Sequence, residues 1–256
     1  MKKLNVLPVI VLLHFFVPGF SQTGDSSKTI SHFSGSISVT HNGISLVPTF
    51  SLGKPATIFL LSVGGKRLSF EPDLRFALEG KPWSFLFWWR YKVVPSGKFR
   101  LTVGAHPALN FRTMRLFVNG DSANVIVARR FLAGEIVPNY MLSKNVSVGV
   151  YYLFSKGFDI NVPRNSHFLT INSSISNIKL PGELYMKLTP QFYYLKQDVR
   201  DGFYFSSSMS LAKKNFPLSV SAIINKTVSG NILGSKNFVW NTSLVYSFNK
   251  NYARTK

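Results

Sequence analysis

The chain contains no cysteine and few acidic residues. Without cysteine there is no disulfide framework, no thiolate chemistry and no cysteine-based metal site. Thirty lysine and arginine residues oppose ten aspartate and glutamate residues, which gives a formal net charge of +20 over 256 residues. All charged residues together make up only 16% of the chain, whereas phenylalanine occurs 23 times. The sequence is therefore basic overall, sparsely charged and rich in aromatic side chains.

Motifs for metal or nucleophilic chemistry are also missing. The histidines beyond residue 30 are His32, His41, His106 and His167, and no HxxxH or HExxH spacing joins them. There is no GxSxG motif and no phosphate-binding P-loop. Ser166-His167 would suit a lipid-modifying barrel enzyme, but spacing alone assembles no nucleophile, base and orienting group. We therefore predict no catalytic residue, no metal ligand, no cofactor and a protein that is not an enzyme.

Long apolar runs are absent except at the N-terminus. Two lysines precede an almost wholly apolar segment, and Gly19 and Ser21 supply the small residues that a cleavage site requires. Prolines and a histidine interrupt the segment and leave it short of the roughly 20 apolar residues of a membrane-spanning helix. We predict a signal peptide over residues 1–21, cleaved between Ser21 and Gln22, and an N-terminal tail over residues 22–32.

Helical periodicity is lacking as well, and alternation with a period of two replaces it. Turn signals such as His41-Asn42-Gly43 separate the alternating runs. Counting from Ile44 gives about fourteen strands, most of them roughly 8 to 12 residues long, as bilayer-crossing strands are. If doubtful pairs of strands around residues 107–131 are each merged into one strand, the count becomes twelve. Phe33 to Thr40 is a possible extra strand. We predict one domain over residues 33–256.

Two all-β architectures fit this pattern. A water-soluble barrel buries its apolar face, whereas a transmembrane barrel turns that face to lipid and encloses the polar one. The apolar faces carry large side chains and almost no small ones. Lipid can surround such a face, whereas the interior of a water-soluble barrel could not pack so many large side chains. Aromatic residues near the strand ends suit interfacial girdles; they are Phe70, Phe76, Trp83, Tyr91, Phe238 and Phe248. The sequence thus favours an antiparallel up-and-down transmembrane β-barrel in the bacterial outer membrane.

The longest connections fall at one end of such a barrel. If the last strand, 237–248, runs inward, the predicted outer loops are 227–236, 197–201, 155–166 and 132–134. The inner turns are then 213–216, 180–182 and 144–145. This assignment makes 44–52 the first outward strand and agrees with the long outer loops and short periplasmic turns of such barrels.

The stretch RLSFEPDLRFAL at 67–78 concentrates charge on one face of a strand. Placing four charges on lipid would cost roughly 2–4 kcal/mol for each mid-bilayer arginine, so we predict that they face the lumen. A turn over 79–82 would pair positions that place Glu71 opposite Arg90 on the next strand. Pro72 would then require a bulge or gap, because it donates no ladder hydrogen bond. The predicted lumenal polar network comprises Arg67, Glu71, Asp73, Arg75, Arg90 and Arg100.

The basic excess suits an anionic partner. Nucleic acid would match the charge alone, but an exported chain without a concentrated basic module argues against it. Many basic residues lie in the predicted loops and turns, among them Lys156, Arg164, Lys196, Arg200, Lys213 and Lys214. Those in the outer loops suit the phosphates of lipopolysaccharide, and we assign no partner to those in the inner turns. We predict outer-membrane lipid and lipopolysaccharide as partners and no nucleic acid.

Several segments resemble outer-membrane β-barrel proteins of Bacteroidetes-type bacteria, a mostly uncharacterised group. They are the export signal ending in Gly19-Phe20-Ser21-Gln22, GISLVPTFSLGKPA (43–56), LSFEPDLRFALEGKPWSFLFWWRY (68–91) and VWNTSLVYSF (239–248). The resemblance covers most of the chain beyond residue 21 and implies an outer-membrane barrel, but no substrate. One departure from the pattern is that the chain continues after Phe248 to Lys256.

Two functions follow from this architecture. At twelve to fourteen strands the lumen is wider than that of an eight-stranded barrel filled by its own side chains, which predicts a passive pore or small-solute channel. The alternative is a non-conducting structural or partner-binding barrel, which inward-facing charges and bulky Trp88, Tyr185 and Tyr193 would suit.

Overall fold

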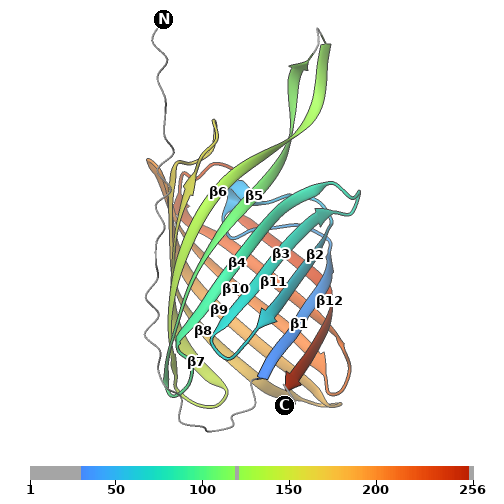
Figure 1. Ribbon diagram of the computed structural model, residues 1–256, viewed down its shortest axis with the longest axis vertical. Helices are drawn as coiled ribbons and strands as arrows, with labels where there is room; N and C mark the ends of the chain where they lie inside the picture. Colours follow the sequence, from blue (N-terminus) through green and yellow to red (C-terminus); the bar gives the residue numbers. More distant parts are fainter. Residues whose placement is uncertain (1–29, 119–120, 254–256) are drawn as a thin grey trace, which may run out of the picture.

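The computed structural model describes residues 30–118 and 121–253, and in these residues twelve antiparallel strands close into a barrel (Figure 1). The predicted alternative of twelve strands is confirmed, and the count of fourteen is wrong. The strands are β1 (Ile30–Thr40), β2 (Ala56–Gly64), β3 (Leu68–Ala77), β4 (Pro82–Val94), β5 (Phe99–Val118), β6 (Asp121–Met141), β7 (Val146–Gly157), β8 (Asn165–Leu180), β9 (Leu184–Gln197), β10 (Arg200–Lys213), β11 (Leu218–Gly230) and β12 (Phe238–Ala253).

The first and last strands close the sheet. β1 pairs with β12 from Ile30↔Ala253 to Thr40↔Ser243, and every other strand pairs with its neighbours in sequence. β1 begins at Ile30, so the barrel starts before the predicted boundary at residue 33, and β12 runs past Phe248 to Ala253. The predicted signal peptide and the first part of the predicted tail lie outside the described residues.

Residues 44–52 do not form the predicted strand. They belong to the β1–β2 connection, which contains the single 3-10 turn η1 (Pro48–Phe50). Pro48 stands at the first position of η1, where its missing N–H is tolerated and its fixed φ suits the turn. The real first strand is the segment around Phe33 to Thr40, so the alternation at 44–52 was the misleading signal.

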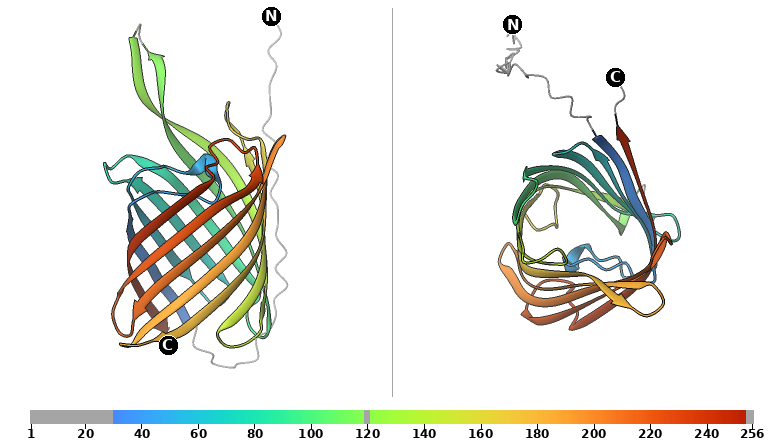
Figure 2. Two further views of the ribbon diagram at one scale, coloured as in Figure 1. Left: turned by 180° about the vertical axis from the view of Figure 1, so that it is seen from behind. Right: turned by 90° about the horizontal axis from the view of Figure 1, so that it is seen from below.

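β5 and β6 form a long hairpin that projects beyond the rest of the barrel (Figures 1 and 2). Their ladder is continuous from Phe99↔Tyr140 to Val118↔Asp121. The predicted outer loop at 132–134 is therefore wrong, because these residues lie inside β6. Gly134 pairs with Ala105 in an unbroken register.

The wall has its polar face inside and its apolar face outside. Among the described residues, buried polar side chains outnumber buried apolar ones, and many large apolar side chains are exposed. In β3, Ser69, Asp73 and Ala77 are buried, whereas Leu68 is 51% exposed on the opposite face. This distribution is the reverse of that in a water-soluble barrel and is the one that a surrounding lipid would stabilise.

Pro72 lies at a break in the β2–β3 ladder. That ladder runs from Ala56↔Ala77 to Leu60↔Asp73 and resumes at Val63↔Phe70, so the two intervening positions are unpaired. On the other side Pro72 pairs with Phe87 without a shift of register. The proline therefore sits where one neighbouring strand does not need its missing N–H.

The connections fall into two sets. Those at the end of the barrel that holds the last residue of β12 span 65–67, 95–98, 142–145, 181–183 and 214–217, and those at the other end include 41–55, 78–81, 158–164, 198–199 and 231–237. The predicted inner turns lie in the first set. No helix in the described part of the chain is long and apolar enough to cross a membrane.

Two neighbouring residues in the middle of β8 test the lipid-facing assignment. Ile171 points outward and is 69% exposed, whereas Asn172 lines a cavity inside the barrel. We expect Ile171→Arg to reduce the free energy of unfolding in lipid vesicles by roughly 2–4 kcal/mol, because it places a charge in hydrocarbon. Asn172→Arg lies at the same depth and should cost much less. Equal losses in denaturant titrations of the two variants would contradict the assignment.

Candidate functional site: the barrel lumen

The β1–β2 connection, residues 41–55, folds into the barrel instead of outward. Figure 2 shows η1 inside the ring of strands when the barrel is viewed along its length. Main-chain carbonyls of this inward loop accept hydrogen bonds from the wall: Trp83 Nε1 donates to Phe50 O at 2.7 Å, and Arg112 donates to Ser51 O at 2.9 Å and to Thr49 O. The loop is thus held across the lumen by side chains from β4 and β5.

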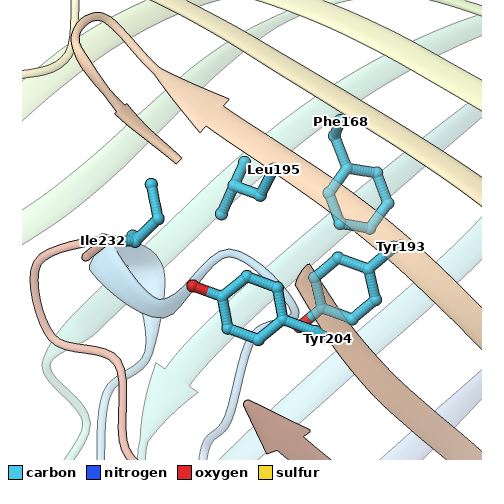
Figure 3. Packing of buried hydrophobic residues seen from close by; sticks show 5 residues of the cluster. All are labelled: Phe168, Tyr193, Leu195, Tyr204 and Ile232. Carbon is cyan, nitrogen blue, oxygen red and sulfur yellow. The ribbon is translucent and has the colours of Figure 1, made fainter. Parts of the chain in front are cut away.

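An aromatic cluster holds the inward loop from the opposite wall. It consists of Phe168, Tyr193, Leu195, Tyr204 and Ile232 (Figure 3), and Leu46 and Val47 of the loop pack against it. The rings of Tyr193 and Tyr204 are stacked, with centroids 4.7 Å apart. The Tyr193 hydroxyl donates to Leu46 O at 3.0 Å. Both walls therefore contribute to fixing residues 41–55.

The bulge between β3 and β4 explains how Trp83 reaches the loop. The register shifts between Arg75 and Phe76, where Arg75 pairs with Ser84 and Phe76 pairs with Pro82. The extra residue, Trp83, turns into the lumen and is fully buried. The prediction that Trp83 belongs to an interfacial girdle is therefore wrong.

Two cavities lie along the inward loop. The outer cavity, of about 780 Å³, is lined by η1 residues, by the connections 158–164, 198–199 and 231–237, and by Arg112 and Arg129. The inner cavity, of about 540 Å³, is lined by Leu46, Val47 and Phe50 of the loop and by aromatic residues of the wall. Ser45 lines both cavities. The loop thus lies between two cavities, and Ser45 borders both of them.

An ion-pair network links residues of β3, β4 and β6 across the intervening β5, and its central residue, Arg90, lines the inner cavity. Arg90 on β4 contacts Glu71 on β3 at 2.5 Å and Glu135 on β6 at 2.6 Å. Gly104 of β5 lies between Arg90 and Glu135 in the register, and a Cβ there would stand 2.9 Å from Oε1 of Glu135. The missing side chain leaves the space through which Arg90 reaches Glu135.

Hydrogen bonds and ring contacts complete this network. Tyr151 donates to Glu135 Oε2 at 2.8 Å, and Ser69 donates to Glu71 Oε1 at 2.6 Å. The Arg90 guanidinium lies 4.3 Å from the ring centroid of Trp88. Glu135 is buried, and its carboxylate has both a guanidinium and a phenol as donors, as a buried charge requires.

Asp73 and Arg75 form a separate pair on the same face of β3. The interaction is bidentate: Arg75 Nε donates to Asp73 Oδ1 at 2.8 Å, and Arg75 Nη2 donates to Asp73 Oδ2 at 2.6 Å. The Arg75 guanidinium also lies 5.2 Å from the ring centroid of Trp83. Alternate residues of a strand share a face, so Asp73 and Arg75 lie side by side and neutralise each other's charge locally.

The structure brings four of the predicted network residues onto the lumenal face: Glu71, Asp73, Arg75 and Arg90. The predicted register was wrong by two positions, because Arg90 pairs with Ser69 and reaches Glu71 diagonally. Arg67 lies in the turn after β2 and contacts Tyr91 and Val93. Arg100 is exposed near the start of β5. Neither Arg67 nor Arg100 makes an ion pair among the described residues.

Sequence reasoning missed Glu135, Tyr151 and the inward loop. Assigning 132–134 to a loop removed Glu135 from any strand face. Had β6 been read as continuous, the alternation from Phe131 through Ala133 would have placed Glu135 inside. The inward loop is held through its main-chain carbonyl groups. Every residue has such a group, so the sequence does not reveal which ones accept hydrogen bonds from the wall.

Ser166 and His167 do not form a nucleophile and base. They are consecutive in β8 and point to opposite faces: Ser166 is buried inside and accepts a hydrogen bond from Gln197, and His167 contacts the Tyr152 hydroxyl at 2.9 Å. No group of three or more potential metal-ligating side chains occurs within 30–118 and 121–253. The predicted cleavage residues, Ser21 and Gln22, lie outside the described residues.

Comparison with known proteins adds context for the barrel. No family model matches the chain, and no curated protein matches it significantly. Among solved structures, the chain is similar to the KdgM porin, with a TM-score of 0.49, 10% identity and coverage of 84% of this chain and 99% of that one. An outer membrane channel from Pseudomonas putida F1 gives a TM-score of 0.48, 11% identity and coverage of 91% and 99%. OmpT, an outer membrane protein of Vibrio cholerae, gives a TM-score of 0.44 and 10% identity, with coverage of 88% of this chain and 99% of that one.

These identities and TM-scores are too low to carry an argument about function. The similar structures are outer-membrane barrels, and none of them points to the Bacteroidetes-type group that the sequence resembles. The prediction that the chain is not an enzyme does not stand as a conclusion. The matches include OmpT outer-membrane proteins at 8–10% identity, and likenesses this distant leave enzymatic activity undecided.

Removing Arg90 tests the ion-pair network. Its side chain is 28% exposed and Glu135 is almost completely buried, so Arg90→Met leaves a buried carboxylate without its cation. We expect a loss of about 3 kcal/mol in the free energy of unfolding. Adding Glu135→Gln to Arg90→Met should recover part of this loss, because the unpaired charge is then gone. Additive losses in the double variant, measured by denaturant titration, would contradict the coupling.

Proposed function

We propose that the chain is an integral outer-membrane β-barrel that acts as a channel for small solutes, with residues 41–55 as its constriction. The observation that carries this proposal is the pair of cavities whose linings share Ser45 and divide the other lining residues of the loop between them. A lumen with space on both sides of a narrow point suits selective passage. A barrel filled by its own side chains would leave no such spaces.

The apolar outward face supports a position in a membrane. Alternating strands whose polar groups face a lumen and whose large apolar groups face outward are typical of outer-membrane barrels. In the usual orientation of such barrels the chain ends lie in the periplasm. The inward loop and the projecting β5–β6 hairpin would then lie at the outer end. Export by the predicted signal peptide would provide the route.

Outward basic residues near the same end suit the phosphates of the outer leaflet. Lys156 and Lys196 are exposed, and their neighbours along each strand are buried in the lumen. We include contact with lipopolysaccharide in the proposal because ammonium groups at this level could form charge-assisted hydrogen bonds with phosphate.

A non-conducting barrel is the second candidate. The observation that favours it is the number of contacts that fix the inward loop on both walls, through Trp83, Arg112 and Tyr193. If this loop sealed the lumen, the protein would serve as a structural or partner-binding element.

A single cysteine decides between the two candidates. Because the chain has no native cysteine, Ser45→Cys carries the only thiol. We expect steady single-channel conductance in planar bilayers and a marked decrease after a bulky thiol reagent modifies residue 45, since the reagent would fill the narrow point.

The matched control is Leu244→Cys, whose side chain is exposed on the outward face. The same reagent should leave its conductance unchanged. A folded wild-type protein without conductance would overturn the channel proposal and support the sealed barrel. Conductance that is insensitive to modification at residue 45 would show that solutes do not pass beside the inward loop.

A further inference from the structure

The outer cavity carries an excess of positive charge. Its wall includes four basic residues, Arg112, Arg129, Arg200 and Lys236, and one acidic residue, Asp198. The basic residues come from β5, β6, the start of β10 and the connection 231–237, so they surround the space from several sides. The cavity has the form of a basic ring above the inward loop.

This positive charge is not neutralised by neighbouring acids. None of the four basic residues makes an ion pair with any residue in the described ranges. The Asp198 carboxylate accepts the backbone N–H groups of Arg164 at 2.9 Å and Asn165 at 2.8 Å. Arg112 donates to carbonyl groups of the inward loop, which carry no charge that could neutralise the guanidinium.

Two of these cations face each other across adjacent strands. Asn110 pairs with Arg129 and Arg112 pairs with Val127, so the two arginines are diagonal neighbours on the lumenal face. Like charges at such positions repel each other, and an anion between them would relieve the repulsion. Both side chains are half-buried, where screening by water is reduced.

Arg130, the next residue along β6, shows the contrast. It points outward and pairs with Asp159 of the connection 158–164 at 2.7 Å. The hydrogen bonds from Arg130 hold the pKa of the Asp159 carboxyl below its usual value. The outward arginine thus has an acidic partner, whereas the inward Arg129 has none in the described part of the chain.

The inner cavity has no comparable excess of charge. Arg75 is paired with Asp73, and Arg90 lies between two glutamates. The remaining wall is mainly apolar and aromatic and includes Phe131 and Phe168. Of the two cavities, only the outer one is therefore lined by an excess of basic residues without ion-pair partners in the described ranges.

We infer that the outer cavity selects small anions that carry carboxylate, phosphate or sulfate groups. A guanidinium binds such groups through two parallel hydrogen bonds, and walls of low dielectric constant focus the field of the basic ring on the solute path. This inference rests on the proposed channel function and adds the class of solute.

The test is the reversal potential of the reconstituted full chain across a gradient of potassium chloride. We expect the wild type to pass chloride several-fold better than potassium. The triple variant Arg129→Gln, Arg200→Gln, Lys236→Gln should lose most of this preference. Arg112 is left intact because it also holds the inward loop.

The matched control removes the same total charge from the outside of the barrel. Lys144, Lys226 and Lys250 are exposed and line neither cavity, and their replacement by glutamine should leave the chloride preference unchanged. Equal loss in both triple variants would overturn the inference, because overall charge would then suffice to explain it.

The outcomes also separate the inference from the proposed function. A wild-type channel that prefers potassium or discriminates against neither ion overturns the inference and leaves the channel standing. If the folded wild type does not conduct, the channel fails, and calorimetry with inorganic phosphate at low ionic strength decides the inference. Binding that the lumenal triple variant loses would support it, and no binding by the wild type would overturn it.

Discussion

Hydrogen bonds between β1 and β12 close the sheet on itself, and every other feature of this protein depends on that closure. A strand in lipid has no water to satisfy its N–H and C=O groups, so an open edge would be costly. The eleven residue pairs from Ile30↔Ala253 to Thr40↔Ser243 remove the two edges. Closure also gives the wall two different environments. The ring of twelve strands encloses a lumen lined by polar side chains, and its outer face remains apolar.

The lumen is wide enough to require a filling element, and the first connection provides it. Residues 41–55 fold inward, and their carbonyl groups accept hydrogen bonds from Trp83, Arg112 and Tyr193. Trp83 and Arg112 come from the paired strands β4 and β5, whereas Tyr193 comes from β9 on the opposite wall, so the three donors surround the loop only in the closed barrel. A loop whose backbone groups are satisfied by wall side chains can lie inside the barrel without exposing unpaired polar groups.

The two cavities differ in whether their charged side chains are paired. Below the inward loop, Arg90 lies between Glu71 and Glu135, and Asp73 is paired with Arg75, so the charges are compensated. Above it, Arg112 and Arg129 are neighbours without an acidic partner among the described residues. Compensated charges stabilise the wall, whereas the uncompensated ones leave a net positive field in the outer cavity.

The sequence by itself determined the alternating strands and the direction in which the charges of β3 point, because the free energy of placing arginine in lipid exceeds any local preference. It also indicated twelve strands as one of two counts. Only the tertiary structure decided that Glu135 joins Arg90 across Gly104, that a bulge turns Trp83 inward and that residues 41–55 enter the lumen. These features depend on the register between strands and on contacts between distant segments, and period-two alternation is the same for every register that differs by two residues.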